Sequence, residues 1–288
     1  MSNISEYDTL VVMSGAADTF TFESADGVLA YRDTGGTGRS VVLLHAGFLD
    51  SSMFDAQLPV LRRRYRVIAP DARGHGESDN ATQPFRQSDD LAALLRHISI
   101  EPAFLVGVSM GAMIAVDTAI DHPELVSGLV IGGRGIGEPE YRDGWSQQLA
   151  DTQADALACG DIASWLDSFL LWAAGPYRPM ADVDPTVTES LRHMASRTLA
   201  KHTTPQPDFH LPIADGEARA ETIAVPVLAV DGALDSPDLT ATVDRLLSAV
   251  PDARRTTIDG AGHFPNMEQP AVYNRLIEEF VEQTTSPG

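Results

Sequence analysis

Residues 103–120 of the chain have the sequence AFLVGVSMGAMIAVDTAI. An apolar run from Ala103 to Val108 leads to Ser109, and a second apolar segment of helical length, Met110 to Ile120, follows directly. A continuous run of β-branched and apolar residues is typical of a strand that is covered on both faces, as in a parallel sheet. The stretch therefore predicts a buried strand, a tight turn at Ser109 and a buried helix.

The turn contains a G-x-S-x-G pattern, Gly107-Val108-Ser109-Met110-Gly111. Between a strand and a helix, such a turn strains the serine backbone and projects its hydroxyl from the sheet edge, while the glycines leave room where side chains would collide. The start of the helix offers the Met110 backbone N–H to a developing negative charge. Ser109 is therefore the candidate nucleophile, and a serine that only caps the helix is the alternative.

Similar apolar runs alternate with helical segments along the rest of the chain. The runs lie at 41–44, 67–69, 129–131, 227–230 and, more weakly, 255–258. The amphipathic helical segments lie at 55–64, 88–98, 239–250 and 271–283. This alternation predicts an open, mostly parallel sheet flanked by helices, and two short strands at 19–23 and 28–33 indicate a hairpin before it.

The alternation stops between residues 134 and 222. This stretch holds all three tryptophans and has helical segments at 146–157, 162–172 and 186–199, but no strong strand run. We predict that residues 134–222 form a helical cap inserted into an α/β core. The core would comprise residues 19–133 and 223–288, and residues 1–18 would form an N-terminal arm.

A serine hydroxyl becomes an effective nucleophile when a base takes its proton, and an acid must orient that base. His263 lies on a glycine-rich loop after the last strand run, where it can reach the carboxyl edge of the sheet. His45 and His75 also follow strands and compete for the role of base. For the acid, Asp235 emerges at the same edge, with Asp231 as its rival.

The order Ser109, Asp235, His263 resembles the order used by the α/β-hydrolase superfamily. Further segments are similar to motifs of that family, namely His45-Ala46-Gly47-Phe48, Asp71-Ala72-Arg73-Gly74-His75-Gly76-Glu77-Ser78, and Gly262-His263-Phe264-Pro265 with Glu268 and Pro270. The resemblance covers residues 19–133 and 223–284. It implies the α/β-hydrolase fold, with Ser109 as nucleophile, His263 as base and Asp235 as acid.

The resemblance also implies an oxyanion hole. The residue two positions after His45 supplies a backbone N–H, so Gly47 is the expected donor beside Met110, with Phe48 as the neighbouring alternative. Ala46 stands where glycine is commonest in the family. On this interpretation, the two competing histidines are structural residues of their loops.

Aromatic residues of the cap are candidates for a substrate pocket, with core packing as the alternative. They are Trp145, Trp165, Phe169, Trp172 and Tyr177. Attack of Ser109 on a carbonyl carbon would form an acyl-enzyme that water then releases, which predicts hydrolysis of a small carboxylic ester or lactone. This chemistry needs no metal or organic cofactor, and no Cys/His cluster has zinc spacing.

Other activities remain alternatives on the same fold. Family members that hydrolyse carbon–carbon bonds also use serine, and cofactor-free haloperoxidases and perhydrolases share the G-x-S-M-G pattern. Some members with an intact triad act as noncatalytic receptors for small molecules. A serine nucleophile disfavours haloalkane dehalogenation, which relies on an aspartate.

The charge balance of the 288-residue chain restricts its partners. Lys and Arg total 20 against 41 Asp and Glu, so the formal net charge is −21. Phosphate backbones and anionic membranes would be repelled, which disfavours nucleic acid and membranes as partners and favours an apolar small-molecule substrate.

The single cysteine, Cys159, is expected to be buried. The sequence shows no signal peptide and no apolar stretch of about 20 residues, so we expect a cytoplasmic protein. The sequence does not determine its oligomeric state.

Overall fold

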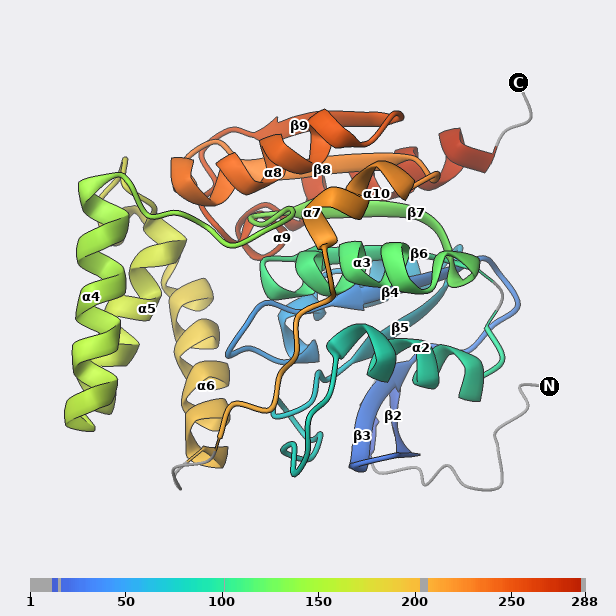
Figure 1. The fold of residues 1–288 in the computed structure, drawn as a ribbon, viewed down its shortest axis with the longest axis horizontal. Coiled ribbons are helices and arrows are strands. Elements are labelled where there is room, and N and C mark those ends of the chain that lie inside the picture. The colour runs from blue at the N-terminus through green and yellow to red at the C-terminus, as the bar shows by residue number, and fades with distance from the viewer. Residues whose placement is uncertain (1–11, 15–16, 101, 203–206, 286–288) are drawn as a thin grey trace.

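A nine-stranded sheet runs through the described part of this computed structural model, which comprises residues 12–14, 17–100, 102–202 and 207–285 (Figure 1). From one edge to the other, the strand order is β1-β2-β3-β5-β4-β6-β7-β8-β9. The strands are β1 Val12–Ser14, β2 Ala17–Ser24, β3 Gly27–Asp33, β4 Ser40–Leu44, β5 Arg66–Pro70, β6 Ala103–Val108, β7 Val126–Gly132, β8 Val227–Gly232 and β9 Ala253–Ile258.

Strands β4 to β9 are parallel, and the hairpin β2–β3 joins them through an antiparallel pairing of β3 with β5. The register places Val42 of β4 between Ile68 and Leu105 of its neighbours. Because β4, β6, β7, β8 and β9 run in the same direction, their carboxyl ends meet at one edge of the sheet, where sites of open α/β sheets form. The predicted mostly parallel α/β sheet is confirmed.

Apolar layers cover both faces of the sheet. Along β4, Val41 and Leu43 pack into one layer together with α10, whereas Val42 and Leu44 pack into the other layer against α2 and α3. The helices outside the α4–α6 group are α1 Leu58–Leu61, α2 Gln87–His97, α3 Met110–Asp121, α7 Gly216–Arg219, α8 Pro237–Ala249, α9 Pro265–Glu268 and α10 Pro270–Thr285. None of the helices in the described ranges is long and apolar enough to cross a membrane.

Between β7 and β8 the chain forms the helices α4 Gly144–Cys159, α5 Ile162–Ala174 and α6 Pro185–Lys201. They stand side by side at one end of the sheet (Figure 1). Each begins at an aspartate whose carboxylate accepts from backbone N–H groups of the first turn, namely Asp143, Asp161 and Asp184. Cys159 at the end of α4 is exposed, so the expectation that it is buried is wrong.

The proposed division into arm, core and cap stays a prediction. Of the predicted arm at 1–18, residues 1–11 and 15–16 lie outside the described residues, and β2 already begins at Ala17. Short 3₁₀ turns complete the chain: η1 Ser51–Phe54, η2 Pro123–Leu125, η3 Met180–Asp182 and η4 Ala220–Thr222.

The helix predicted at 55–64 is wrong. The chain instead forms η1 at Ser51–Phe54 and the single turn α1 at Leu58–Leu61. Pro59 explains the interruption, because proline has no N–H and its ring clashes with the carbonyl four residues earlier. It lies in the first turn of α1, where the missing N–H is tolerated.

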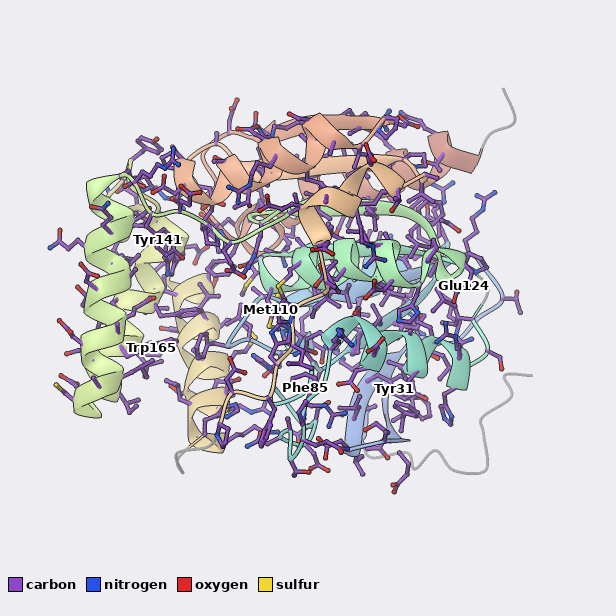
Figure 2. All side chains as sticks on the ribbon, in the orientation of Figure 1. Tyr31, Phe85, Met110, Glu124, Tyr141 and Trp165 are labelled. Carbon is purple, nitrogen blue, oxygen red and sulfur yellow. The ribbon has the colours of Figure 1, made fainter. Side chains whose placement is uncertain are left out.

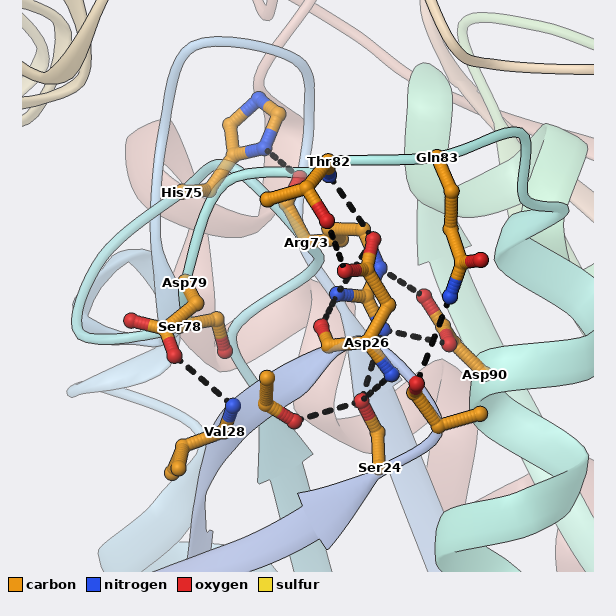
Figure 3. A network of polar contacts seen from close by, with 12 residues as sticks. Ser24, Asp26, Val28, Arg73, His75, Ser78, Asp79, Thr82, Gln83 and Asp90 are labelled. Carbon is orange, nitrogen blue, oxygen red and sulfur yellow. Dashed lines mark hydrogen bonds and ion pairs between the residues drawn. The ribbon is translucent and has the colours of Figure 1, made fainter.

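The turn after β5 is held by a network around Arg73, whose side chain is buried (Figure 3). Its Nε donates to Oδ2 of Asp90 at 2.7 Å, and its Nη2 donates to Oδ1 of Asp90 at 2.8 Å and to the Ser24 hydroxyl at 2.9 Å. Its Nη1 donates to the backbone oxygen of Asp26. Arg73 therefore ties the D-x-R-G-x-G-x-S turn to α2 and to the β2–β3 hairpin.

Arg73→Met should lower the free energy of unfolding by about 3–5 kcal/mol, because it leaves the carboxylate of Asp90 without its buried partner. Urea unfolding of the variant and wild type measures the difference. Arg192→Met is the matched control, since Arg192 pairs with Asp167 at the surface and should contribute less than about 1 kcal/mol. Equal losses in the two variants would contradict this account of the turn.

Candidate active site

Ser109 lies at the strained turn between β6 and α3. Its backbone angles are φ 56° and ψ −116°, which a non-glycine residue adopts only where its surroundings enforce them. Its N–H donates to the carbonyl of Gly132 at 2.8 Å, and its own carbonyl accepts from the N–H groups of Ala112 at 2.9 Å and Met113 at 3.1 Å. Bonds to β7 and α3 thus fix Ser109 at the rim of a cavity.

Two glycines permit this turn. A Cβ on Gly107 would lie 2.2 Å from the backbone oxygen of Gly111, and a Cβ on Gly111 would lie 1.9 Å from the backbone oxygen of Leu44. Closely packed backbone atoms cannot move aside at low cost, so neither position accepts a side chain. The spacing of the G-x-S-x-G pattern follows from the close approach of β4, β6 and α3.

Asp235 and His263 follow β8 and β9 and meet at the carboxyl edge of the sheet. Nδ1 of His263 lies 2.9 Å from Oδ2 of Asp235, and both side chains are buried. The second carboxylate oxygen of Asp235 accepts from the N–H of Ser236 at 2.7 Å. A carboxylate on Nδ1 orients the ring and leaves Nε2 for proton transfer. His263 and Ser109 line the same cavity.

The rival acid, Asp231, has different partners. One of its oxygens accepts from the N–H of Gly133 at 2.9 Å, and the other accepts from Nε of Arg255 at 2.9 Å. Burial raises the pKa of Asp231 to about 6. Gly133 in turn packs on the imidazole, since a Cβ there would lie 2.6 Å from Cε1 of His263. Gly133 therefore lies between the carboxylate of Asp231 and the imidazole of His263.

The competing histidines are engaged in their own loops. Nε2 of His45 accepts from the N–H of Ala72 at 2.9 Å, and Nδ1 lies 2.9 Å from the carbonyl of Ala46. This pattern requires the neutral tautomer with the proton on Nδ1. The His75 ring packs against His45 with centroids 5.2 Å apart, and its Nδ1 lies 3.0 Å from the carbonyl of Arg73.

His75 should make the protein sensitive to acid. Burial, with the neighbouring His45, lowers the pKa of His75 from 6.5 to about 3. The unfolded chain therefore binds a proton between these values that the folded chain does not, so stability falls as the pH is lowered through this range. Relative to His75→Gln, the wild type should lose up to ~1.4 kcal/mol of unfolding free energy per pH unit. Denaturant unfolding at several pH values measures this loss. If the unfolding free energies of wild type and His75→Gln change with pH in parallel, His75 is not the cause of the acid sensitivity.

The predicted oxyanion donors lie around the same cavity. Gly47 and Phe48 follow β4, and Met110 begins α3, where Figure 2 labels it. Phe48 has a positive φ of 64°, and its ring packs on Trp165 with centroids 4.4 Å apart. Ala46 is buried and does not have a positive φ, and its N–H donates to the sulfur of Met53 at 3.3 Å.

The cavity between the sheet edge and α5 has a volume of about 370 Å³. Of the predicted pocket residues, Trp165, Phe169 and Trp172 line it. Trp145 does not line it but packs edge-on against Trp172, with centroids 5.3 Å apart. Tyr177 is 61% exposed and lies outside the lining.

Sequence reasoning missed much of the cavity wall. The further lining residues are Ala46, Met113, Arg134, Glu138, Pro139, Tyr141, Gln153, His210, Leu239 and Phe264. His210 comes from the segment after α6 and pairs with Phe85 in an isolated bridge. Ala46 and Phe264 stand beside motif residues, whereas most of the others come from the segment between β7 and β8, where no local pattern marks them.

Arg178 fixes the loop that carries His263. It donates to the carbonyls of Ala173 at 2.7 Å and Gly260 at 2.7 Å, and it also pairs with Glu268. The other oxygen of Glu268 accepts from the N–H of Gly262 at 2.8 Å. The G-H-x-P-x-x-E-x-P segment thus uses its glutamate to join α5 to the histidine loop.

Comparisons with known proteins agree with this architecture. The model of the alpha/beta hydrolase family matches residues 41–276. The 3-oxoadipate enol-lactonase 2 of Acinetobacter baylyi is 25% identical over 96% of this chain and 97% of its own. The pimeloyl-(acyl-carrier protein) methyl ester esterase of Aeromonas hydrophila is 28% identical over 85% of this chain and 96% of its own. The enol-lactonase structure from Burkholderia xenovorans LB400 has a TM-score of 0.69 at 24% identity, covering 91% of this chain and 99% of that one.

Proposed function

Because the chain belongs to the alpha/beta hydrolase family, we propose that it hydrolyses a small carboxylic ester or lactone through an acyl-enzyme on Ser109. The observation that carries the proposal is the meeting of three groups at one sheet edge. Ser109 and His263 line one cavity, and Asp235 contacts Nδ1 of His263 at 2.9 Å.

In the first half-reaction, the Ser109 hydroxyl attacks the substrate carbonyl carbon while Nε2 of His263 takes its proton. Asp235 holds the ring in the required tautomer and stabilises its charged form. The N–H groups of Gly47 and Met110 stabilise the oxyanion, and the loss of one such donor typically costs about 3–4 kcal/mol of activation free energy. His263 then returns the proton to the leaving alkoxide oxygen.

In the second half-reaction, His263 removes a proton from water, which attacks the acyl carbon and restores the Ser109 hydroxyl. Since the acyl group is released as a carboxylic acid, each turnover consumes one water molecule. The stacked rings of Trp165 and Phe169, with centroids 5.1 Å apart, offer an apolar wall to the substrate. On this basis we propose a small substrate with an apolar portion that contacts this wall.

A substrate panel tests the proposal. Short p-nitrophenyl esters, lactones and vinylogous diketones, which require carbon–carbon cleavage, are incubated with wild type that has been dialysed against EDTA. We expect turnover of esters or lactones at rates unchanged by the dialysis. Preferential cleavage of the diketones would instead favour a carbon–carbon hydrolase, and binding of substrates without any turnover would favour a receptor.

A further inference from the structure

One wall of the cavity carries an arginine that the proposed reaction does not use. Arg134 comes two residues after β7 and lines the cavity together with Ser109 and His263. Its side chain is 20% exposed. A mostly buried guanidinium normally spends its N–H groups on several acceptors, because unpaired donors away from water are destabilising.

Arg134 is incompletely paired. Its Nε is buried and has no hydrogen-bond partner among the residues that the structure describes. Its Nη2 donates to Oε2 of Glu138 at 2.9 Å. Glu138 lies four residues further along the chain, and its side chain is 83% exposed. Surface pairs of this kind are weak and easily exchanged. Nη1 has no hydrogen-bond partner among the described residues either, so the terminal nitrogens of Arg134 retain binding capacity inside the cavity.

Arg178 shows the contrast. It lies beside the loop that carries His263, and it donates to the carbonyls of Ala173, Ala174 and Gly260 as well as to Glu268. Its donors are used by the fold itself, so it has no role for a ligand. Both arginines come from the segment between β7 and β8, and of the two only Arg134 lines the cavity.

Neighbouring groups leave the charge of Arg134 partly uncompensated. Burial lowers the pKa of His210, and Arg134 lowers it further, so His210 is uncharged at neutral pH. Burial raises the pKa of Asp117 to about 7 despite Arg134, so this carboxyl carries only part of a negative charge. Burial also raises the pKa of Tyr141, which keeps its phenol proton and lines the same cavity.

Arg134 lines the cavity, and among the described residues its one hydrogen bond goes to an exposed carboxylate, so we infer that its terminal N–H groups bind a carboxylate on the substrate. The inference rests on the proposed function and names its substrate class, the ester or lactone of a carboxylate-bearing acid. The planar guanidinium suits a carboxylate, and a charge-assisted bond in a half-buried site is stronger than one in water. The aromatic wall would contact the chain between the two ends of such a molecule.

A matched pair of ester series tests the substrate class. The monomethyl esters of C4–C8 dicarboxylic acids carry one carboxylate, and the methyl esters of the corresponding monocarboxylic acids carry none. For at least one chain length, wild type should prefer the anionic ester. Arg134→Gln should lower the anionic-to-neutral ratio of kcat/KM by at least about tenfold, mainly through KM.

Three further variants sharpen the result. Arg134→Lys should retain part of the preference because it keeps the charge but loses the planar fork. Glu138→Gln should increase the preference, since it removes the acid that competes for Arg134. Arg142→Gln is the control, because Arg142 is 77% exposed, pairs with Glu140 and lies outside the cavity lining. An unchanged ratio in Arg134→Gln, or an equal fall in Arg142→Gln, would overturn the inference.

A binding measurement separates this inference from the proposed reaction. Calorimetry with the free C4–C8 dicarboxylates requires no turnover and therefore does not depend on Ser109. We expect the dissociation constant to rise at least about tenfold from wild type to Arg134→Gln. Equal affinity in both proteins, or no binding to wild type across the series, would reject the carboxylate site even if ester hydrolysis were established.

Discussion

Ser109→Ala should reduce kcat for ester or lactone hydrolysis by about 10⁶-fold, because the nucleophile and its base act as one unit. Removing the hydroxyl leaves only binding and the oxyanion donors, which still provide about 10³–10⁴ over the reaction in water. The measurement is steady-state hydrolysis of the best substrate from the panel. Contaminating esterase activity in the preparation of the variant must be below the detection limit.

The variant should fold normally, since alanine keeps the Cβ and the backbone bonds that hold the turn at φ 56°. Ser127→Ala is the matched control. Ser127 lies on β7 and its hydroxyl bonds to the carbonyl of Pro102, away from the cavity. Its kcat should stay within about twofold of wild type. Hydrolysis at the wild-type rate by folded Ser109→Ala would contradict the proposed mechanism.

Asp235→Asn should reduce kcat by about 10⁴-fold with little change in structure, because an amide on Nδ1 favours the wrong imidazole tautomer. Asp235 is buried and accepts from the N–H of Ser236, a bond that the amide oxygen of asparagine can keep. Far-UV circular dichroism and thermal unfolding check the fold, and substrate saturation curves separate kcat from KM.

Asp231→Asn provides the discriminating comparison. Because its carboxylate contacts Gly133 and Arg255 and not the imidazole, we expect its kcat to fall less than about tenfold. If the loss in Asp231→Asn equals or exceeds the loss in Asp235→Asn, the assignment of the acid must be reversed.

Local patterns suffice to predict much of this fold. The helix expected at 88–98 occurs at Gln87–His97, and the one expected at 186–199 occurs at Pro185–Lys201. Both have clear amphipathic spacing, and an aspartate caps the second. The helix expected at 55–64 failed because the apolar spacing continues through Pro59, whose backbone chemistry ends a helix regardless of pattern.

Residues that act through long-range packing were harder to predict. Ser109 and His263 lie in recognisable motifs, so sequence alone could nominate them. The choice of Asp235 over Asp231 is favoured by contacts with His263, Gly133 and Arg255 that depend on the relation of β8 to β9.

The cavity wall is still less visible in the sequence. Trp165 and Trp172 line the cavity while Trp145, which has the same chemistry, packs behind Trp172. Tyr177 faces solvent, and His210 reaches the cavity from a segment without any periodic pattern. These outcomes depend on how α4, α5 and α6 sit on the sheet edge, which single-sequence periodicity does not encode.

Covalent labelling tests the activation of Ser109 most directly. Wild type and Ser109→Ala are treated with a fluorophosphonate probe, digested, and analysed by peptide mass spectrometry. We predict one adduct per wild-type chain, on the peptide that contains Ser109, and no adduct at that peptide in the variant. Folded wild type that remains unlabelled, or labelling that is equal in both proteins, would contradict the assignment of Ser109 as the nucleophile.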